Sequence, residues 1–219
     1  MPNLIFRRFW IAFLRCAFHL FYNPFAFTYD PISALVSRGH WRNWTRAAIP
    51  HIVGARILEI PCGTGNLLLD LCNAGFHPIG IDLSSSMIRI SRGKIRHARC
   101  SAPLLQARAQ SLPLASQSFD SIIMTFPPGF VFDPRALAEF KHILKVNGRL
   151  IWVDGGRLLP RDAWSRALNA ALNATDREGD FGRVASEALG RAGFEARVET
   201  LQDEASIVSV VIATKKGGE

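Results

Sequence analysis

The segment RILEIPCGTGNLLLDL, residues 56–71, constrains the fold more than any other part of the chain. Its first half is a short apolar run that contains one acid, Glu59, as is typical of a buried parallel strand. The leucines that follow Asn66 predict a helix with Asp70 on its outer side. A turn with two glycines lies between the strand and the helix. Together they predict a parallel α/β unit in which the helix N-terminus faces a nucleotide-like ligand.

The turn and the next strand sharpen this prediction. Gly63 and Gly65 would let the backbone approach the ligand closely, where a Cβ atom would intrude. The following strand ends at Asp82, an acid placed to hydrogen-bond a ribose hydroxyl. A nicotinamide-binding turn would carry a third glycine where this chain has Leu68. The pattern therefore does not fit a nicotinamide dinucleotide.

The run from Glu59 to Gly65 resembles the first motif of class I S-adenosylmethionine-dependent methyltransferases, although Pro61 replaces the first glycine of that motif. The resemblance implies S-adenosylmethionine as the cofactor. It also implies an α/β fold with a Rossmann-like, doubly wound, seven-stranded sheet, mostly parallel with a C-terminal antiparallel hairpin. We expect an N-terminal helical cap over residues 1–50 and the S-adenosylmethionine-binding methyltransferase domain over residues 51–219.

Strands and helices are expected to alternate along the chain. Ser84 and Asp133 are predicted helix N-caps, and Asn147 is predicted to adopt the left-handed conformation of a turn. The other strands are expected at Leu104–Arg108, Ser118–Met124, Ile151–Val153, Glu195–Thr200 and Ile207–Thr214. Further helices are expected at Trp41–Ile49, Asp162–Leu172 and Phe181–Ala192.

The resemblance implies cofactor contacts from the glycine turn and from the strand ends. Arg108 stands where the family has an acid that contacts the adenine amino group, so backbone groups near Ala109 and Gln110 are expected to hold adenine. The segment after Thr125 lacks the polar residue of amino-methylating enzymes and predicts a rigid apolar pocket wall. The expected cofactor-binding residues are Glu59, Pro61, Cys62, Gly63, Gly65, Asn66, Asp82, Leu83, Ala109, Gln110 and Thr125.

A narrower resemblance lies upstream of the glycine turn. The residues in register with the signature of the ubiquinone/menaquinone-biosynthesis C-methyltransferases are Tyr29, Asp30, Ser37, Gly39 and Trp44. Trp41 occupies that family's histidine position, with His40 one place early. The resemblance implies a small, lipophilic, quinone-like acceptor; alternatively, the aromatic side chains only pack a helical cap onto the sheet. The candidates for a catalytic base are Tyr29, Asp30 and His40, although a surface or capping role suits His40 better.

Residues 4–22 are rich in aromatic side chains. On a helix, Arg8, Arg15 and His19 would form one narrow basic stripe. A transmembrane span is not expected, because Arg15 interrupts an apolar run that is far shorter than roughly 20 residues. A secretory signal is not expected either. Two interpretations stay open: a helix packed on the catalytic domain and, preferred here, a helix in the membrane interface with its cations at the headgroups.

The net charge of +8 fits an anionic partner, either a membrane surface or nucleic acid. The basic run from Arg89 to Arg99 has no interleaved aromatic residues, so a solvated face is preferred to a nucleic-acid groove. The four cysteines have neither metal-ligand spacing nor the density of a disulfide scaffold. We therefore expect reduced thiols, no metal, and a cytoplasmic protein that is peripheral on the inner face of the membrane. The oligomeric state stays open.

Three functions are consistent with the sequence. The preferred one is an enzyme that transfers a methyl group from S-adenosylmethionine to a small, apolar molecule. The second is a methyltransferase for RNA or a protein side chain, which the charge supports. The third is a non-catalytic protein that uses the same fold for binding.

Overall fold

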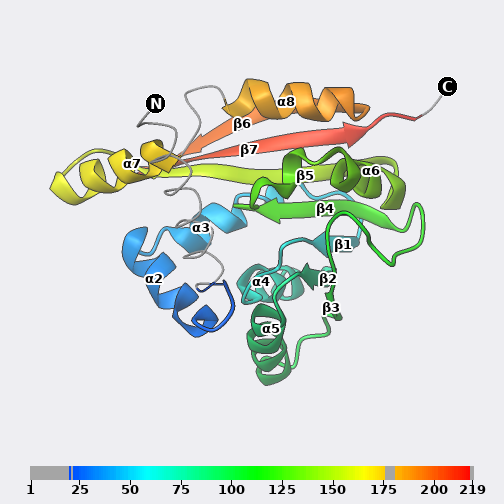
Figure 1. Ribbon diagram of the computed structural model, residues 1–219, viewed down its shortest axis with the longest axis horizontal. Helices are drawn as coiled ribbons and strands as arrows, with labels where there is room; N and C mark the ends of the chain where they lie inside the picture. The colour runs from blue at the N-terminus through cyan, green and yellow to red at the C-terminus, as the bar shows by residue number, and fades with distance from the viewer. Residues whose placement is uncertain (1–19, 21, 176–180, 218–219) are drawn as a thin grey trace, which may run out of the picture.

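The computed structural model describes residues 20, 22–175 and 181–217, which form a seven-stranded sheet flanked by helices (Figure 1). The strand order is β3-β2-β1-β4-β5-β7-β6. The pairs among β1 to β5 are parallel, and β7 is antiparallel to β5 and β6. The strands are β1 Arg56–Glu59, β2 His77–Asp82, β3 Leu104–Gln106, β4 Phe119–Thr125, β5 Leu144–Leu158, β6 Phe194–Gln202 and β7 Ser206–Lys215. The doubly wound sheet and its C-terminal hairpin are confirmed.

The helices lie on both faces of this sheet. Two short helices of the N-terminal region, α2 and α3, precede β1, and the others follow the strands they connect (Figure 1). The α-helices are α2 Tyr29–Val36, α3 Trp41–Arg46, α4 Asn66–Asn73, α5 Ser85–His97, α6 Pro134–Ile143, α7 Ala163–Thr175 and α8 Phe181–Arg191. The short 3-10 helices are η1 Ala26–Thr28, η2 Ile49–His51 and η3 Gly129–Phe132.

The two largest clusters of the core form apolar layers, one on each face of the sheet. Successive side chains of a strand point to opposite faces, so neighbours along β4 and β5 belong to different layers. Ile122 and Leu150 pack in the layer that includes side chains of α6 and α8. Ile123 and Ile151 pack in the layer that includes side chains of α3 and α4. Burial on both faces explains the continuous apolar runs of these strands.

The predicted elements differ from the structure mainly at β5. The expected strand at Ile151–Val153 extends from Leu144 to Leu158, because Leu144 already pairs with Phe119 of β4. A register shift follows, and within it Asn147 adopts the expected left-handed conformation with φ of 61°. The turn predicted from the sequence is therefore an irregularity inside one long strand.

Two helix starts follow the predicted capping chemistry. The Ser84 side chain accepts a hydrogen bond from the Met87 N–H at 3.2 Å and caps α5. The Asp133 side chain accepts one from the Arg135 N–H at 3.0 Å and caps α6, with proline at the first helical position. Short-range hydrogen bonds thus fix both helices at the places that the sequence indicates.

One expectation about the cysteines is wrong. Cys72, at the end of α4, forms a disulfide with Cys100, which follows α5, and their Cα atoms lie 6.2 Å apart. Cys62 is free and buried in the glycine turn. The pairing was missed because it depends on how α4 and α5 lie against each other, which cysteine spacing does not show.

Most of the aromatic segment 4–22 lies outside the described residues, so its helix stays a prediction. Within residues 20, 22–175 and 181–217, no helix combines the length and apolar character needed to cross a membrane. The same residues contain no group of three His, Cys, Asp or Glu side chains arranged to hold a metal ion.

Candidate functional site

The centre of the candidate site is the turn between β1 and α4, beside the end of β2. The Gly63 N–H donates to Asp82 Oδ2 at 2.9 Å, and the Ser84 N–H donates to Asp82 Oδ1 at 2.8 Å. Burial raises the pKa of Asp82, while these backbone hydrogen bonds oppose the shift. The carboxylate of Asp82, the last residue of β2, therefore lies against the glycine turn, as expected for the carboxyl edge of parallel strands.

The two glycines of the turn have different roles. A Cβ atom on Gly63, where φ is 50°, would meet no atom of the described residues within 4 Å. A Cβ atom on Gly65, where φ is 82°, would lie 2.2 Å from the Ser91 Oγ of α5. Gly63 thus presents its backbone to open space, whereas Gly65 allows α4 and α5 to approach each other. The prediction that both glycines serve a ligand fits Gly63 better.

Glu59 lies at the end of β1, beneath this turn. Its side chain is buried, and its Oε2 has no hydrogen-bond partner within the described part of the chain. Burial raises the pKa of Glu59 well above its ordinary value, and the negative charges of Asp82 and Asp70 add to the rise. An unsatisfied buried acid beside an open glycine fits a ligand that carries a cationic or hydrogen-bonding group.

Further predicted contacts line the same edge of the sheet. Leu83 follows Asp82 and is 57% exposed, although it is a large apolar side chain. Its carbonyl accepts a hydrogen bond from Gln106 Nε2 at 3.0 Å. Ala109 is buried, but the Gln110 amide donates to Asp133 Oδ2 at 3.2 Å and so engages the cap of α6. The Gln110 side chain thus also has a structural role, because it holds the N-cap residue of α6.

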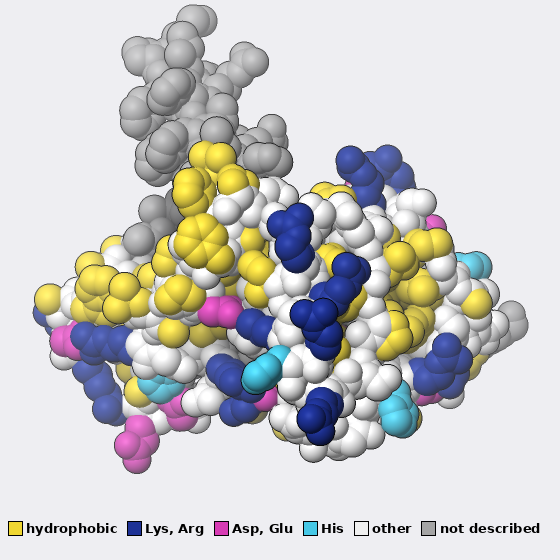
Figure 2. Space-filling view, turned by 90° about the horizontal axis from the view of Figure 1, so that it is seen from below, with side chains coloured by type: hydrophobic (Ala, Val, Ile, Leu, Met, Phe, Trp, Pro, Cys, Tyr) yellow, Lys and Arg dark blue, Asp and Glu magenta, His cyan; other side chains and the backbone are white. Residues whose placement is uncertain are grey.

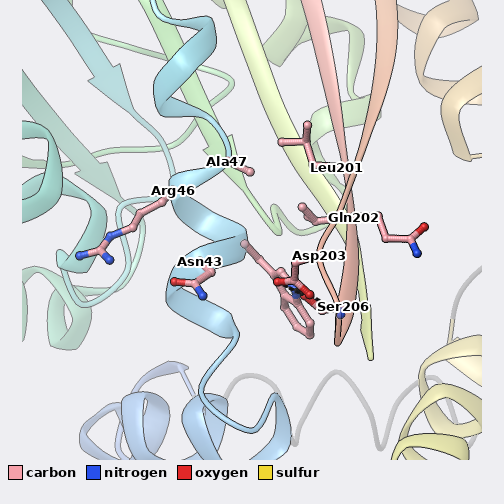
Figure 3. A pocket seen from close by; sticks show the side chains of 9 residues that line it. Asn43, Arg46, Ala47, Leu201, Gln202, Asp203 and Ser206 are labelled. Carbon is pink, nitrogen blue, oxygen red and sulfur yellow. Dashed lines mark hydrogen bonds between the residues drawn. The ribbon is translucent and has the colours of Figure 1, made fainter. Parts of the chain in front are cut away.

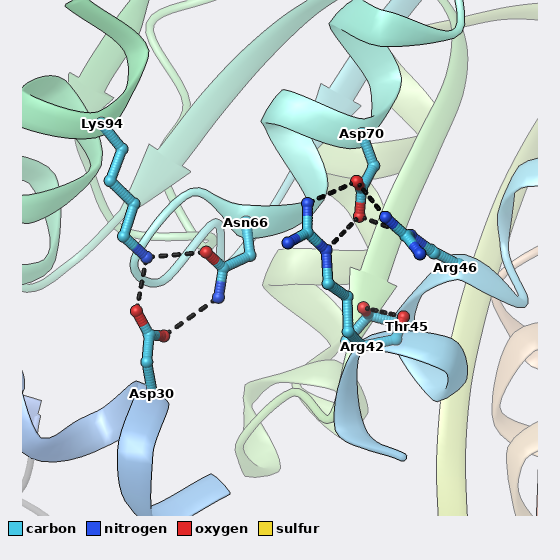
Figure 4. A network of polar contacts seen from close by, with 7 residues as sticks. All are labelled: Asp30, Arg42, Thr45, Arg46, Asn66, Asp70 and Lys94. Carbon is cyan, nitrogen blue, oxygen red and sulfur yellow. Dashed lines mark hydrogen bonds and ion pairs between the residues drawn. The ribbon is translucent and has the colours of Figure 1, made fainter. Parts of the chain in front are cut away.

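Asp30 of α2 joins the N-terminal region to the glycine turn (Figure 4). Its Oδ1 accepts hydrogen bonds from Thr64 Oγ1 at 2.6 Å and from Asn66 Nδ2 at 3.0 Å. Its Oδ2 lies 2.5 Å from Lys94 Nζ of α5, which also donates to Asn66 Oδ1 at 2.7 Å. Burial alone would raise the pKa of Asp30, but these partners lower it. Asp30 is therefore ionised and held by three elements.

A second acid, Asp70 of α4, makes a similar connection (Figure 4). Arg42 and Arg46 of α3 both donate to its carboxylate through two nitrogens, at 2.7 to 3.2 Å. The expectation that Asp70 lies on the outer side of its helix is wrong, since its side chain is only 5% exposed. The two guanidinium groups come from a segment before β1, and they make burial of this carboxylate tolerable.

Aromatic side chains cover the site from the N-terminal side. Trp41 stacks on Phe126 with ring centroids 4.3 Å apart, and Tyr29 meets the edge of Trp41 at 6.1 Å. Phe126 follows β4 directly and has a left-handed backbone with φ of 47°. Trp41 therefore fills the space between Tyr29 and Phe126. The expected apolar wall after Thr125 is an aromatic stack that the N-terminal helices complete.

Tyr22 lies above Asp82 and was not predicted from the sequence. Its carbonyl accepts a hydrogen bond from Ser84 Oγ at 2.6 Å. Burial, followed by the negative charge of Asp82, raises the pKa of Tyr22. Burial likewise raises the pKa of Tyr29 far above its ordinary range. Both phenols therefore stay protonated at neutral pH, and Tyr22 contacts Ser84, two residues after the acid that was expected to bind ribose.

His40 does not belong to this group. Its Nδ1 lies 3.6 Å from Asp203 Oδ2 and 3.4 Å from Ser206 Oγ, at the turn between β6 and β7. Trp44 Nε1 donates to the same Ser206 hydroxyl at 3.0 Å. The structure thus brings Tyr29 and Asp30 to the glycine turn but places His40 where α3 meets the C-terminal hairpin.

A cavity of about 300 Å³ lies beside this hairpin contact (Figure 3). Asn43 and Ala47 line one side, and Leu201 and Gln202 line the other, while Arg46 points away toward α4. A second cavity of about 450 Å³ lies between α6 and α8. Neither is lined by a residue expected to bind the cofactor.

The structure brings most of the predicted site residues together and places four further residues beside them. Glu59, Pro61, Cys62, Gly63, Gly65, Asn66, Asp82 and Leu83 lie at the carboxyl ends of β1 and β2, and Thr125 ends the adjacent β4. The added residues are Tyr22, Thr64, Lys94 and Gln106. Thr64 could have been noticed as a polar residue within the motif, whereas Lys94 lies 28 positions after Asn66 and reaches it only in the folded chain. Nothing in the sequence indicates the Tyr22 contact.

Comparison with known proteins gives matches over the same region. Residues 57–148 match the family described as "Methyltransferase domain". A ubiquinone/menaquinone biosynthesis C-methyltransferase of Syntrophotalea carbinolica is 37% identical over 134 residues, which is 58% of this chain and 56% of that protein. A demethylmenaquinone methyltransferase of Clavibacter sepedonicus is 32% identical over 127 residues, which is 56% of this chain and 51% of that protein. The chain thus spans about half the length of these relatives.

Solved structures resemble the chain over more of its length. A SAM-dependent methyltransferase of Thermotoga maritima has a TM-score of 0.65 at 25% identity and covers 90% of this chain and 99% of its own. A geranyl diphosphate C-methyltransferase of Streptomyces coelicolor has a TM-score of 0.61 at 14% identity, with 79% and 75% covered, and shares the fold. The expected family resemblance and the expected fold are thereby confirmed.

Proposed function

We propose that this chain, which carries a methyltransferase domain of the S-adenosylmethionine-dependent class, transfers a methyl group to a small, lipophilic, quinone-like acceptor. The observation that carries the proposal is the cluster at the carboxyl edge of the sheet. There, the open Gly63 backbone and the Asp82 carboxylate lie together with Glu59, whose Oε2 has no hydrogen-bond partner among the described residues. These groups match the chemical parts of a nucleoside joined to an amino acid.

Each group would hold a different part of the cofactor. S-adenosylmethionine, when bound, supplies a methyl group activated by a sulfonium. Asp82 offers acceptor oxygens for the ribose hydroxyls, and the exposed Leu83 offers an apolar surface for adenine. Glu59 offers its unpaired oxygen to the ammonium group. Gly63 allows the backbone to lie close to the ligand, because its Cβ position is open.

The aromatic stack supports an apolar acceptor. Tyr29, Trp41 and Phe126 place three rings in edge and stacked contacts next to the glycine turn. A flat, apolar ring would pack against such a wall, whereas a charged group would lose hydration there. The relatives named as quinone-biosynthesis methyltransferases lead us to a quinone-like ring as the acceptor.

Positioning and exclusion of water are proposed to supply most of the catalysis. The leaving thioether is neutral, so the displacement needs an aligned acceptor more than an acid. Protonated Tyr29 can donate a hydrogen bond but cannot serve as a base near neutral pH. The oxygens of Asp30 are already engaged by Thr64, Asn66 and Lys94. We therefore assign Asp30 a positioning role.

The test is a methyl-transfer assay with two classes of acceptor. The protein is incubated with S-adenosylmethionine and either a demethylated naphthoquinol or cellular RNA, and the products are analysed by mass spectrometry. We expect a methylated quinol and unmodified RNA. Methylated RNA alone would favour the second function, and cofactor binding without transfer to any acceptor would favour a non-catalytic protein.

Cellular location is part of the same proposal. A lipophilic acceptor resides in a membrane, so we propose a cytoplasmic protein that contacts the inner face of the membrane through residues 4–22. The aromatic and basic character of that segment supports the contact. Fractionation of cells into membrane and soluble parts, with and without a salt wash, checks the location.

A further inference from the structure

We propose that one face of the folded protein, built from η1, α2 and α5, docks onto the surface of an anionic lipid bilayer. This docking face consists of Phe25, Phe27, Ile32 and Leu35 as its apolar part and Arg89, Arg92, Arg96 and Arg99 as its cationic part. None of these residues belongs to segment 4–22, and all of them lie in or directly beside η1, α2 and α5. Membrane docking is argued from the exposure and charge of these residues. Only the delivery of a lipophilic acceptor from the membrane rests on the proposed function.

The apolar part of the docking face consists of large side chains that are exposed to solvent. Phe27 is 70% exposed and Leu35 is 68% exposed, and Phe25 and Ile32 are also exposed. The rings of Phe25 and Phe27 lie 6.4 Å apart. Single exposed apolar residues are common, but a group within one short stretch of chain indicates a surface that meets an apolar partner.

The cationic part follows one side of α5. Arg89, Arg92 and Arg96 are spaced i, i+3 and i+7 and are exposed, so they form a stripe along the helix, and Arg99 extends it. Among the residues that the structure describes, none of these four arginines has an ion-pair partner. Lys94, on another side of the same helix, is paired with Asp30. The stripe is therefore available to an external anion.

The two parts share one face of the molecule. α5 packs against η1, and it is the lowest helix in Figure 1. Figure 2 shows the molecule from that side, with a row of Lys and Arg side chains beside a group of hydrophobic side chains. Apolar side chains that enter the acyl boundary, next to cations at the level of anionic headgroups, are the features of interfacial binding.

Nucleic acid fits this face less well than lipid. A single strand could stack bases on Phe25 and Phe27 and place phosphates near the arginines. Ile32 and Leu35, however, have no aromatic face, so stacking gives no reason for their exposure. A bilayer accommodates aromatic and aliphatic side chains equally, and we therefore choose lipid as the partner.

Docking in this orientation also places α2 between the membrane surface and the candidate site. α2 carries exposed Ile32 and Leu35, and the same helix carries Tyr29 and Asp30 at the site. A lipophilic acceptor that leaves the bilayer would therefore meet the aromatic wall next to the docking face. This step needs no passage of the acceptor through water.

The experiment measures binding of the full chain to sedimenting vesicles of phosphatidylcholine, with or without phosphatidylglycerol. Two double variants, F27S/L35S and R89Q/R92Q, change the apolar and cationic parts and leave residues 1–22 intact. The control K141Q/R191Q removes two exposed cations at the distant α6–α8 surface. Far-UV circular dichroism and the melting temperature verify that each variant is folded.

We expect wild-type protein to bind the anionic vesicles and to lose binding as salt rises. At about 1 kcal/mol for each basic residue near an anionic surface, R89Q/R92Q should weaken binding about 30-fold. F27S/L35S should weaken it at least as clearly, and the control should bind like wild type. Unchanged binding by either test variant would overturn the proposal, and so would binding to a single-stranded oligonucleotide but not to vesicles.

This experiment contains neither cofactor nor acceptor. A test variant that loses vesicle binding but still transfers the methyl group to a detergent-dispersed acceptor would support both proposals. Absence of methyl transfer with intact vesicle binding would count against the proposed function alone.

Discussion

A single methyl group added at either glycine of the β1–α4 turn should have two different effects. At Gly63, where φ is 50°, the new Cβ atom meets nothing within 4 Å in the part of the chain that the structure describes. At Gly65, where φ is 82°, it lies 2.2 Å from Ser91 Oγ and 3.2 Å from Ser91 Cα. Gly63→Ala therefore tests the space in front of the turn, and Gly65→Ala tests the contact between two helices.

The magnitudes follow from these distances. Alanine in a left-handed conformation costs roughly 1–2 kcal/mol at either position. At Gly65 the overlap with a side chain and with the backbone of α5 adds roughly 1–3 kcal/mol. We expect Gly65→Ala to lower the free energy of unfolding by roughly 2–5 kcal/mol in total. Gly63→Ala should lower it by only the roughly 1–2 kcal/mol of the left-handed conformation. The affinity for S-adenosylmethionine should fall at least tenfold in Gly63→Ala.

Urea unfolding measures the free energy of unfolding, and calorimetric titration measures the affinity for S-adenosylmethionine. Ser91→Ala is the matched second variant, because it removes the oxygen that lies closest to the added methyl group. The Ser91 hydroxyl has no hydrogen-bond partner among the described residues, so Ser91→Ala alone should cost little. Combined with Gly65→Ala, it should restore part of the lost stability. Equal destabilisation by the two alanine variants, or no coupling to Ser91, would refute the reasoning.

Three further predictions concern the connections around the site. Asp70→Asn should lower stability by roughly 1–3 kcal/mol, against less than roughly 0.5 kcal/mol for Glu187→Ala in an exposed ion pair, as measured by urea unfolding. The partners of Asp70 lower its pKa, so its contribution should be present above the unfolded-state pKa and disappear as pH falls through the folded-state pKa; a variant with unchanged acid stability would contradict this. Cys72→Ser opens the link to Cys100 across 28 residues and should lower the stability of the oxidised protein by roughly 3–4 kcal/mol, whereas a difference that persists in reductant would point to packing. Asp30→Asn should lower the melting temperature and leave kcat within about tenfold, because a positioning residue supports rather than performs proton transfer; a much larger loss of kcat in a fully stable variant would identify Asp30 as the base.

Local chemistry made much of the fold predictable. The strand, the glycine turn and the capping residues Ser84 and Asp133 depend on neighbours within a few residues, and the structure has them where the sequence indicates. Asp82 could be placed beside Gly63 because parallel strands bring their carboxyl ends to one edge. These features follow from local sequence patterns and from the general geometry of parallel sheets, and a single sequence is enough to apply both.

The errors and omissions concern partners from distant segments. Asp70 looked like a solvated residue of an amphipathic helix, because its position does not reveal that Arg42 and Arg46 approach from α3. The contact between Tyr22 and Ser84 likewise depends on how the N-terminal segment crosses the site. Such contacts follow from the tertiary arrangement, which periodicity and motif spacing do not encode.

The central claim is that the carboxyl edge beside Asp82 binds S-adenosylmethionine, and calorimetric titration of Asp82→Asn tests it most directly. Asp82 also accepts the N–H groups of Gly63 and Ser84, so the variant should lose some stability. Asp120→Asn is the matched control, because Asp120 accepts the N–H groups of Ala55 and Arg56 at the opposite end of the strands.

Both variants are expected to stay folded at 25 °C, as checked by circular dichroism before titration. Asp82→Asn should weaken cofactor binding by roughly 10- to 100-fold, the effect of losing hydrogen bonds to a charged group. Asp120→Asn should bind like wild type. Wild-type affinity in folded Asp82→Asn, or no binding of S-adenosylmethionine by the unmodified chain, would contradict the account.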